Sequence, residues 1–135
     1  MKENRFKDWK KPEFDSKGMT HWKWMCQYHE NLELDIYVDI GAFTYINAKY
    51  GVKIEKNVQI GSHCSIYSHS TIDNKKGKII IKENARIGTH STIMPGVTIG
   101  KNALVGAYSF VNKDIPDNTL AFGIPIQIKK SEEDQ

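Results

Sequence analysis

The chain has 135 residues, a formal net charge of +3 and 26% charged residues, which is the size of one domain. Its charge is too small to argue for a nucleic-acid partner, and the sequence has no run of about eighteen apolar residues that could span a membrane. The lysine-rich start lacks the apolar core of a secretion signal. We therefore expect a soluble, cytoplasmic domain without a nucleic-acid partner or membrane insertion.

Residues 1–35 carry no repeat and are expected to form an N-terminal cap. The aromatic residues scattered through this charged segment include Trp9, Phe14 and Trp24. Their expected role is to pack over the open end of the repeat that follows. A second interpretation is that His21, Trp22 or His29 lines a substrate pocket, because aromatic rings stack on sugar rings and on bases.

An aliphatic residue then returns every six positions, often followed by a small one. The clearest register is Ile54, Ile60, Ile66, Ile72, Ile81, Ile87, Ile93, Ile99, Val105 and Val111. Period six fits neither a 3.6-residue helix nor a simple two-faced strand, so each hexapeptide is predicted to form one short strand and one corner. Three hexapeptides close a triangular coil. The expected fold is all-β, a parallel β-helix of about four coils over residues 36–130.

Two irregularities interrupt the period. A slip near residues 49–52 predicts a bulged corner. Between Asp73 and Ile80 the period is longer by three residues, which predicts a protruding basic loop. Loops that stand off a rigid scaffold often carry binding or catalytic residues. Residues 131–135 are expected to form a short charged tail.

The sequence IGTHSTIMPGVTIG at residues 87–100, with residues 113–116 and 123–125, resembles the hexapeptide-repeat acyltransferases. The pattern is most similar to the galactoside and maltose type and to the sugar acetyltransferases of surface-polysaccharide pathways. This resemblance, over residues 36–130, implies a left-handed β-helix, a homotrimer, and acetyl-coenzyme A bound in the grooves between subunits. The handedness comes from the family alone, because parallel crossovers are generally right-handed.

Matching to the family's motifs implies residues for the cofactor, and the basic loop offers candidates for the acceptor. The positions expected to contact the cofactor are Thr89, Ala107, Asn112, Lys113 and Lys130. Because Gln127 replaces an arginine usual in the galactoside type, Lys129 or Lys130 would supply the phosphate contact. The acceptor implied by the family is a nucleotide-linked amino sugar or a sugar hydroxyl, and the residues expected to contact it are Lys75, Lys76 and Tyr108.

Three histidines, His63, His69 and His90, occupy the same outward position of their hexapeptides. Assigning the hexapeptides to faces with a three-residue insertion places His69, His90 and Tyr108 in one row. The same assignment places His63 on the next face, in the row of Asn84 and Asn102.

Acetyl transfer needs a base that takes a proton from the attacking hydroxyl or amino group, and histidine, with an unperturbed pKa near 6.5, is suited to this. The family often uses a histidine just before the protruding loop. His69 is nearest to that place and is the first candidate for the base, followed by His63 and His90. Asp73 is the candidate partner carboxylate.

Two other functions fit the same fold. A γ-type carbonic anhydrase binds zinc with three histidines at a subunit interface, but two of its ligands lie five residues apart, a spacing that no histidine pair has here. A non-enzymatic trimeric scaffold would keep the solenoid and lose the chemistry, although the segments 113–116 and 123–125 argue against it. We therefore expect an acetyl-coenzyme A-dependent sugar acetyltransferase without a metal.

Overall fold

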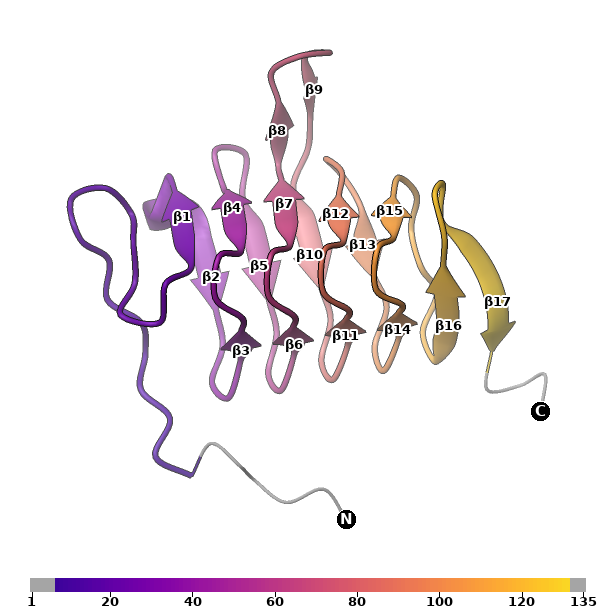
Figure 1. Ribbon diagram of the computed structural model, residues 1–135, viewed down its shortest axis with the longest axis horizontal. Helices are drawn as coiled ribbons and strands as arrows, with labels where there is room; N and C mark the ends of the chain where they lie inside the picture. Colours follow the sequence, from indigo (N-terminus) through magenta and orange to yellow (C-terminus); the bar gives the residue numbers. More distant parts are fainter. Residues whose placement is uncertain (1–6, 132–135) are drawn as a thin grey trace.

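The computed structural model describes residues 7–131, and the side chains of residues 7–129. Most of the tail expected at residues 131–135 lies outside this range. Short parallel strands stack into a prism with three faces (Figure 1). The first sheet contains β1 (Met25–Gln27), β4 (Tyr45–Asn47), β7 (Ser65–Tyr67), β12 (Thr92–Ile93) and β15 (Phe110–Val111).

The other two faces are built in the same way. The second sheet contains β2 (Leu32–Leu34), β5 (Val52–Ile54), β10 (Ile79–Ile81) and β13 (Thr98–Ile99). The third contains β3 (Asp39–Ile40), β6 (Gln59–Ile60), β11 (Arg86–Ile87), β14 (Leu104–Val105) and β16 (Thr119–Phe122), and β17 (Gln127–Ser131) pairs antiparallel to β16. A 3₁₀ turn, His29–Asn31, joins β1 to β2.

The six-residue period forms the core. Isoleucines of successive coils pair directly, as Ile54 does with Ile81 in the second sheet and Ile66 with Ile93 in the first. These side chains are at most 1% exposed, and each is worth about 1.5–3 kcal/mol of burial. The core therefore runs the whole length of the prism.

The repeat is longer than expected at its start. The first sheet has five strands, so the solenoid has about five coils instead of four. Parallel pairing begins with Met25 opposite Tyr45, and residues 25–34 thus belong to the first coil although the sequence placed them in the cap. The expected slip is present as a turn in which the Gly51 amide donates to the Ala48 carbonyl at 2.9 Å.

The protruding loop is an antiparallel hairpin of β8 (His69–Ser70) and β9 (Lys75–Lys76), which stands off the prism between β7 and β10 (Figure 1). Ile66 and Ile81 are consecutive core positions 15 residues apart instead of six, so the insertion has nine residues, not three. Ile72 is therefore not a core residue. It lies in the hairpin and is 98% exposed.

Both ends of the prism are covered. Trp24 is 3% exposed, and the Phe14 ring packs edge-on against it with the ring centroids 5.6 Å apart. The Trp9 indole donates a hydrogen bond to the Val38 carbonyl at 2.9 Å, so aromatic residues fasten the N-terminal segment to the first coil. Ile126 is buried at the opposite end. No helix in residues 7–131 has the length and apolar character needed to cross a membrane.

Candidate functional site

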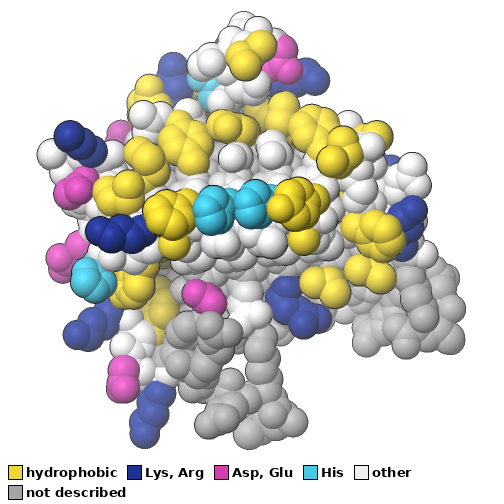
Figure 2. All heavy atoms as spheres, in the orientation of Figure 1, with side chains coloured by type: hydrophobic (Ala, Val, Ile, Leu, Met, Phe, Trp, Pro, Cys, Tyr) yellow, Lys and Arg dark blue, Asp and Glu magenta, His cyan; other side chains and the backbone are white. Residues whose placement is uncertain are grey.

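A row of four neighbouring rings, three of them stacked face to face, runs along the corner between the third and first sheets (Figure 2). This ring ladder consists of Phe43, His63, His90 and Tyr108, all with left-handed backbone angles (φ 58–66°). The His63 and His90 centroids are 4.7 Å apart with a 2° interplanar angle, and those of His90 and Tyr108 are 4.8 Å apart with 6°. The fold thus aligns one ring from each of four coils.

The prediction of which histidines share a row was therefore wrong for one of them. His63, not His69, lies beside His90. The next corner carries Asn57, Asn84, Asn102 and Asn118, again with positive φ, so His63 does not share a row with asparagines. The error follows from counting Ile72 as a core residue, because this moved every later residue by one face relative to the earlier ones.

The hydrogen bonds of Thr89 determine which nitrogen of the His90 ring carries the proton. Thr89 Oγ1 lies 2.6 Å from the Ser62 carbonyl oxygen, which can only accept, so the single hydroxyl proton of Thr89 is used there. His90 Nδ1, at 3.0 Å from the same Oγ1, must then donate. This assignment leaves the lone pair on His90 Nε2, where it can accept a proton.

The root of the hairpin combines an imidazole with basic side chains. His69 is half-buried and contacts the Tyr50 ring edge-on at 5.2 Å. The Lys49 and Lys76 ammonium groups each lie 5.7 Å from the centre of the same ring, within the range of cation–π attraction. The arrangement offers positive charge for a phosphate group and a nitrogen for proton transfer.

Asp73 is not paired with His69. A hydrogen bond with Ser70 is the main cause that lowers the pKa of the Asp73 carboxyl, and Lys75 assists. The Lys75 ammonium lies 3.8 Å from this carboxylate. Asp73 thus interacts within the hairpin, and its contacts among the described residues are with Ser70 and Lys75, not with the imidazole it was expected to assist.

The predicted site residues lie along two edges of the first sheet. Thr89 and Ala107 precede ring-ladder residues at one edge, and the hairpin lies at the other. Asn112 and Lys113 follow β15 at the hairpin edge and are exposed. The Lys130 backbone pairs with Leu120 on the third sheet, whereas its side chain lies outside the described residues.

Between these edges, the outer face of the first sheet carries a polar aromatic group that the sequence reasoning missed. Tyr45 donates a hydrogen bond to the Gln27 side chain, and its ring centroid lies 5.7 Å from that of Tyr67. Asn47, only 8% exposed, donates to the Tyr45 oxygen at 3.5 Å. Burial raises the pKa of Tyr45. Tyr45, Asn47 and Tyr67 are sequence neighbours of the core residues Ile46 and Ile66. Because side chains alternate along a strand, the sequence could have placed them on the outer face.

The cysteines are unsuited to nucleophilic catalysis. Cys26 and Cys64 are free thiols, and both are buried. Burial, assisted by Glu30, raises the pKa of Cys26 to about 12, and burial also raises the pKa of Cys64. Across the described residues, no group of three His, Cys, Asp or Glu side chains is placed to hold a metal ion within one chain.

Comparisons with known proteins agree with the repeat. The family model described as bacterial transferase hexapeptide (six repeats) matches residues 78–113. A galactoside O-acetyltransferase of Lactococcus lactis subsp. lactis (strain IL1403) is 35% identical over 108 residues, covering 69% of this chain and 52% of the relative. A dTDP-3-amino-3,6-dideoxy-alpha-D-galactopyranose 3-N-acetyltransferase of Aneurinibacillus thermoaerophilus is 45% identical over 53 residues, 39% of this chain and 28% of the relative.

Among solved structures, a hexapeptide-repeat acetyltransferase from Vibrio cholerae O1 biovar eltor, complexed with acetyl-coenzyme A, superposes with a TM-score of 0.75. It is 27% identical and the match covers 80% of this chain and 64% of that one. The expected left-handed parallel β-helix is thereby confirmed. The chain spans about half the length of the curated galactoside acetyltransferase that it matches.

Proposed function

Because the chain belongs to the hexapeptide-repeat acyltransferase family, we propose that it transfers the acetyl group of acetyl-coenzyme A to a sugar. The observation that carries the proposal is the match, over 80% of the chain, to a structure that contains acetyl-coenzyme A. The solenoid supplies a rigid support for such a reaction. The root of the hairpin places the half-buried His69 imidazole and the Lys76 ammonium group against the same Tyr50 ring.

The proposed acceptor is a nucleotide-linked amino sugar or a sugar hydroxyl of surface-polysaccharide synthesis. The similar proteins include one named for a galactoside and one named for a dTDP-linked amino sugar, which supports this class of acceptor. Lys75 and Lys76 on β9 are exposed and would pair with the diphosphate of a nucleotide sugar. Tyr108 in the ring ladder would contact the sugar.

The proposed chemistry is direct transfer with a histidine base. The acceptor oxygen or neutral amine attacks the thioester carbonyl while imidazole Nε2 or Nδ1 takes its proton. The tetrahedral intermediate then expels the coenzyme A thiolate, which receives a proton from the imidazolium. His69 is the first choice because it is half-buried at the root of the basic hairpin, and His90, whose Nε2 is free to accept, is the second.

The two edges of the first sheet can form one site if copies assemble as a homotrimer. In the closed ring that we propose, the hairpin edge of one copy would meet the ring-ladder edge of the next. The cofactor positions Thr89 and Ala107 would then lie across a groove from Asn112 and Lys113 of the neighbouring copy. Lys130 would add a phosphate contact.

A thermal-shift titration with acetyl-coenzyme A and with free coenzyme A tests the proposal. A ligand at a hundred times its dissociation constant that binds only the folded state adds about 2.7 kcal/mol to the free energy of unfolding. We expect a saturable rise in melting temperature with both ligands. The absence of any shift at millimolar ligand would contradict the proposal and favour the scaffold.

A further inference from the structure

A pocket of about 310 Å³ lies between the N-terminal segment and β3. All three tryptophans of the chain, Trp9, Trp22 and Trp24, line it. Its volume is at the lower end of the range for small-molecule sites. We propose that this pocket binds one neutral pyranose ring of a glycan, as a sugar-binding site separate from the acetyl-transfer site.

Two of the three tryptophans of the lining, Trp9 and Trp24, are held in place before any ligand arrives. Trp24 is almost fully buried in the core. Trp9 donates its indole hydrogen bond to the Val38 carbonyl at 2.9 Å and packs edge-on against Tyr37 at 6.5 Å. Trp22 keeps 46% of its surface exposed, so it remains accessible to a ligand. Fixed aromatic walls lose little side-chain entropy on binding, which favours recognition of a flat-faced ring.

The charged side chains of the lining favour a neutral ligand. Lys7 and Lys10 are balanced by Asp8 and Asp39, so the pocket has no excess positive charge to attract a nucleoside diphosphate. Carboxylates accept hydrogen bonds from hydroxyl groups, and ammonium groups donate them. A pyranose carries several hydroxyls and one face of C–H bonds, whose partial positive charge suits the negative face of an indole.

The pocket is independent of the residues proposed for acetyl transfer. Neither the ring ladder nor the hairpin contributes a lining residue. Sugar binding here can therefore be measured without acetyl-coenzyme A. A protein that binds glycosides but not coenzyme A would contradict the proposed enzymatic function and leave this inference intact. A protein that binds coenzyme A but no glycoside would contradict this inference and leave the proposed enzymatic function intact.

Tryptophan fluorescence is the measurement of choice, because every tryptophan of the chain lines this pocket. The purified full chain is titrated with the methyl glycosides of glucose, galactose, mannose and N-acetylglucosamine. We expect a saturable change with at least one of them. In Trp22→Ala, where Trp9 and Trp24 still report, affinity for that glycoside should fall at least about fivefold, as expected for the loss of one stacking ring.

A matched control is Tyr28→Ala. Tyr28 is similarly exposed, at 43%, and lies outside the pocket in the turn after β1, so its loss should leave glycoside affinity unchanged. Two results would overturn the proposal. One is the lack of a saturable response to any of the four glycosides, with or without a Trp22-dependent response to thymidine diphosphate. The other is equal affinity in Trp22→Ala and the unaltered chain.

Discussion

At the level of single residues, the proposed reaction depends most on His69. Replacing His69 with alanine should lower turnover by about two to four orders of magnitude, because the attacking group loses its base. The protein should stay folded, with a melting temperature lowered by no more than a few degrees, because the half-buried side chain loses its contact with the Tyr50 ring. The measurement is the initial rate of coenzyme A release in the presence of an acceptor sugar.

The matched variant is His90→Ala, which removes the other candidate nitrogen. Unchanged turnover in His69→Ala together with a large loss in His90→Ala would move the base to the ring ladder. The sequence could identify both histidines as outward residues. It could not predict that His90 donates from Nδ1, because this depends on Thr89 and on a carbonyl of the preceding coil.

At the level of elements, two isoleucines of the same six-residue series should behave in opposite ways. Ile87→Asp should unfold the solenoid, because it places an unpaired charge in the core, where Ile87 is 3% exposed. Ile72→Asp should leave the melting temperature within about 2 °C of the unaltered chain, since surface substitutions seldom change stability by more than about 0.5 kcal/mol. Thermal unfolding followed by circular dichroism compares them, and equal destabilisation would contradict the nine-residue insertion.

The same pair shows what periodicity can and cannot predict. The strands of the solenoid follow from residues such as Ile54 and Ile99, because period six fits a triangular coil alone among regular structures. Ile72 matches that period by coincidence, within a hairpin whose pairing of His69 with Lys76 is a separate structure. Periodicity does not distinguish an apolar residue in the core from one in an insertion. The row of histidines was misplaced for this reason.

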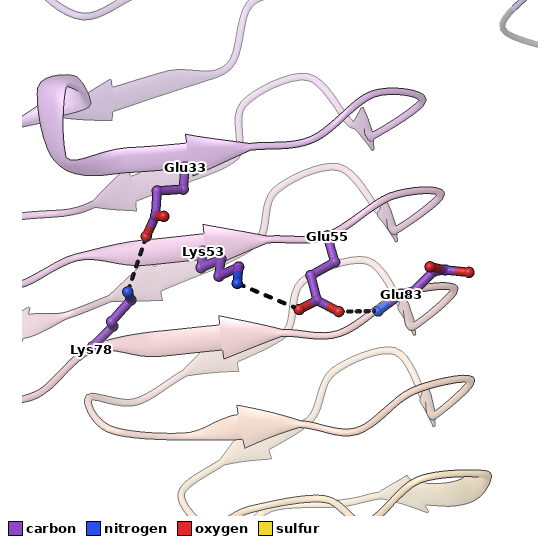
Figure 3. A network of polar contacts seen from close by, with 5 residues as sticks. All are labelled: Glu33, Lys53, Glu55, Lys78 and Glu83. Atoms are coloured by element: carbon purple, nitrogen blue, oxygen red, sulfur yellow. Dashed lines mark hydrogen bonds and ion pairs between the residues drawn. The ribbon is translucent and has the colours of Figure 1, made fainter.

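At the level of the whole molecule, the faces differ in character. The outer surface of the second sheet is charged: Lys78 pairs with Glu33 at 3.0 Å, and Lys53 with Glu55 at 3.9 Å (Figure 3). Exposed pairs of this kind contribute little to stability, and they suit a surface in water. The ring-ladder corner instead exposes Phe43 and Tyr108 at over 60% each, which suits contact with another copy.

Subunit mixing tests whether the site is shared between copies. His69→Ala removes the hairpin-edge function, and Ala107→Trp blocks the ring-ladder edge with a bulky side chain at an exposed position. Each variant alone should be nearly inactive. In randomly mixed trimers, about a quarter of the sites would combine an intact edge from each parent, because each interface of the proposed closed ring would join the hairpin edge of one copy to the ring-ladder edge of the next.

Acetyltransferase activity of the co-expressed, co-purified mixture is the measurement, and the expected value is about a quarter of the normal activity per site. Separately purified variants that are combined only in the assay serve as the control for subunit exchange. Persistent inactivity of mixed trimers whose composition mass spectrometry has verified would mean that one copy holds the complete site.

The hairpin is closed at its base, where the Gly77 amide donates to the Ser68 carbonyl at 2.9 Å. The chain leaves the prism and returns at the same corner, so the coils before and after it keep their stacking whatever the length of the inserted segment. In the coils, every sixth side chain must fit a core that is as closely packed as an organic crystal. The inserted segment has only to bring the chain back to the Gly77 amide, so its side chains beyond His69 can differ without disturbing the stacked coils.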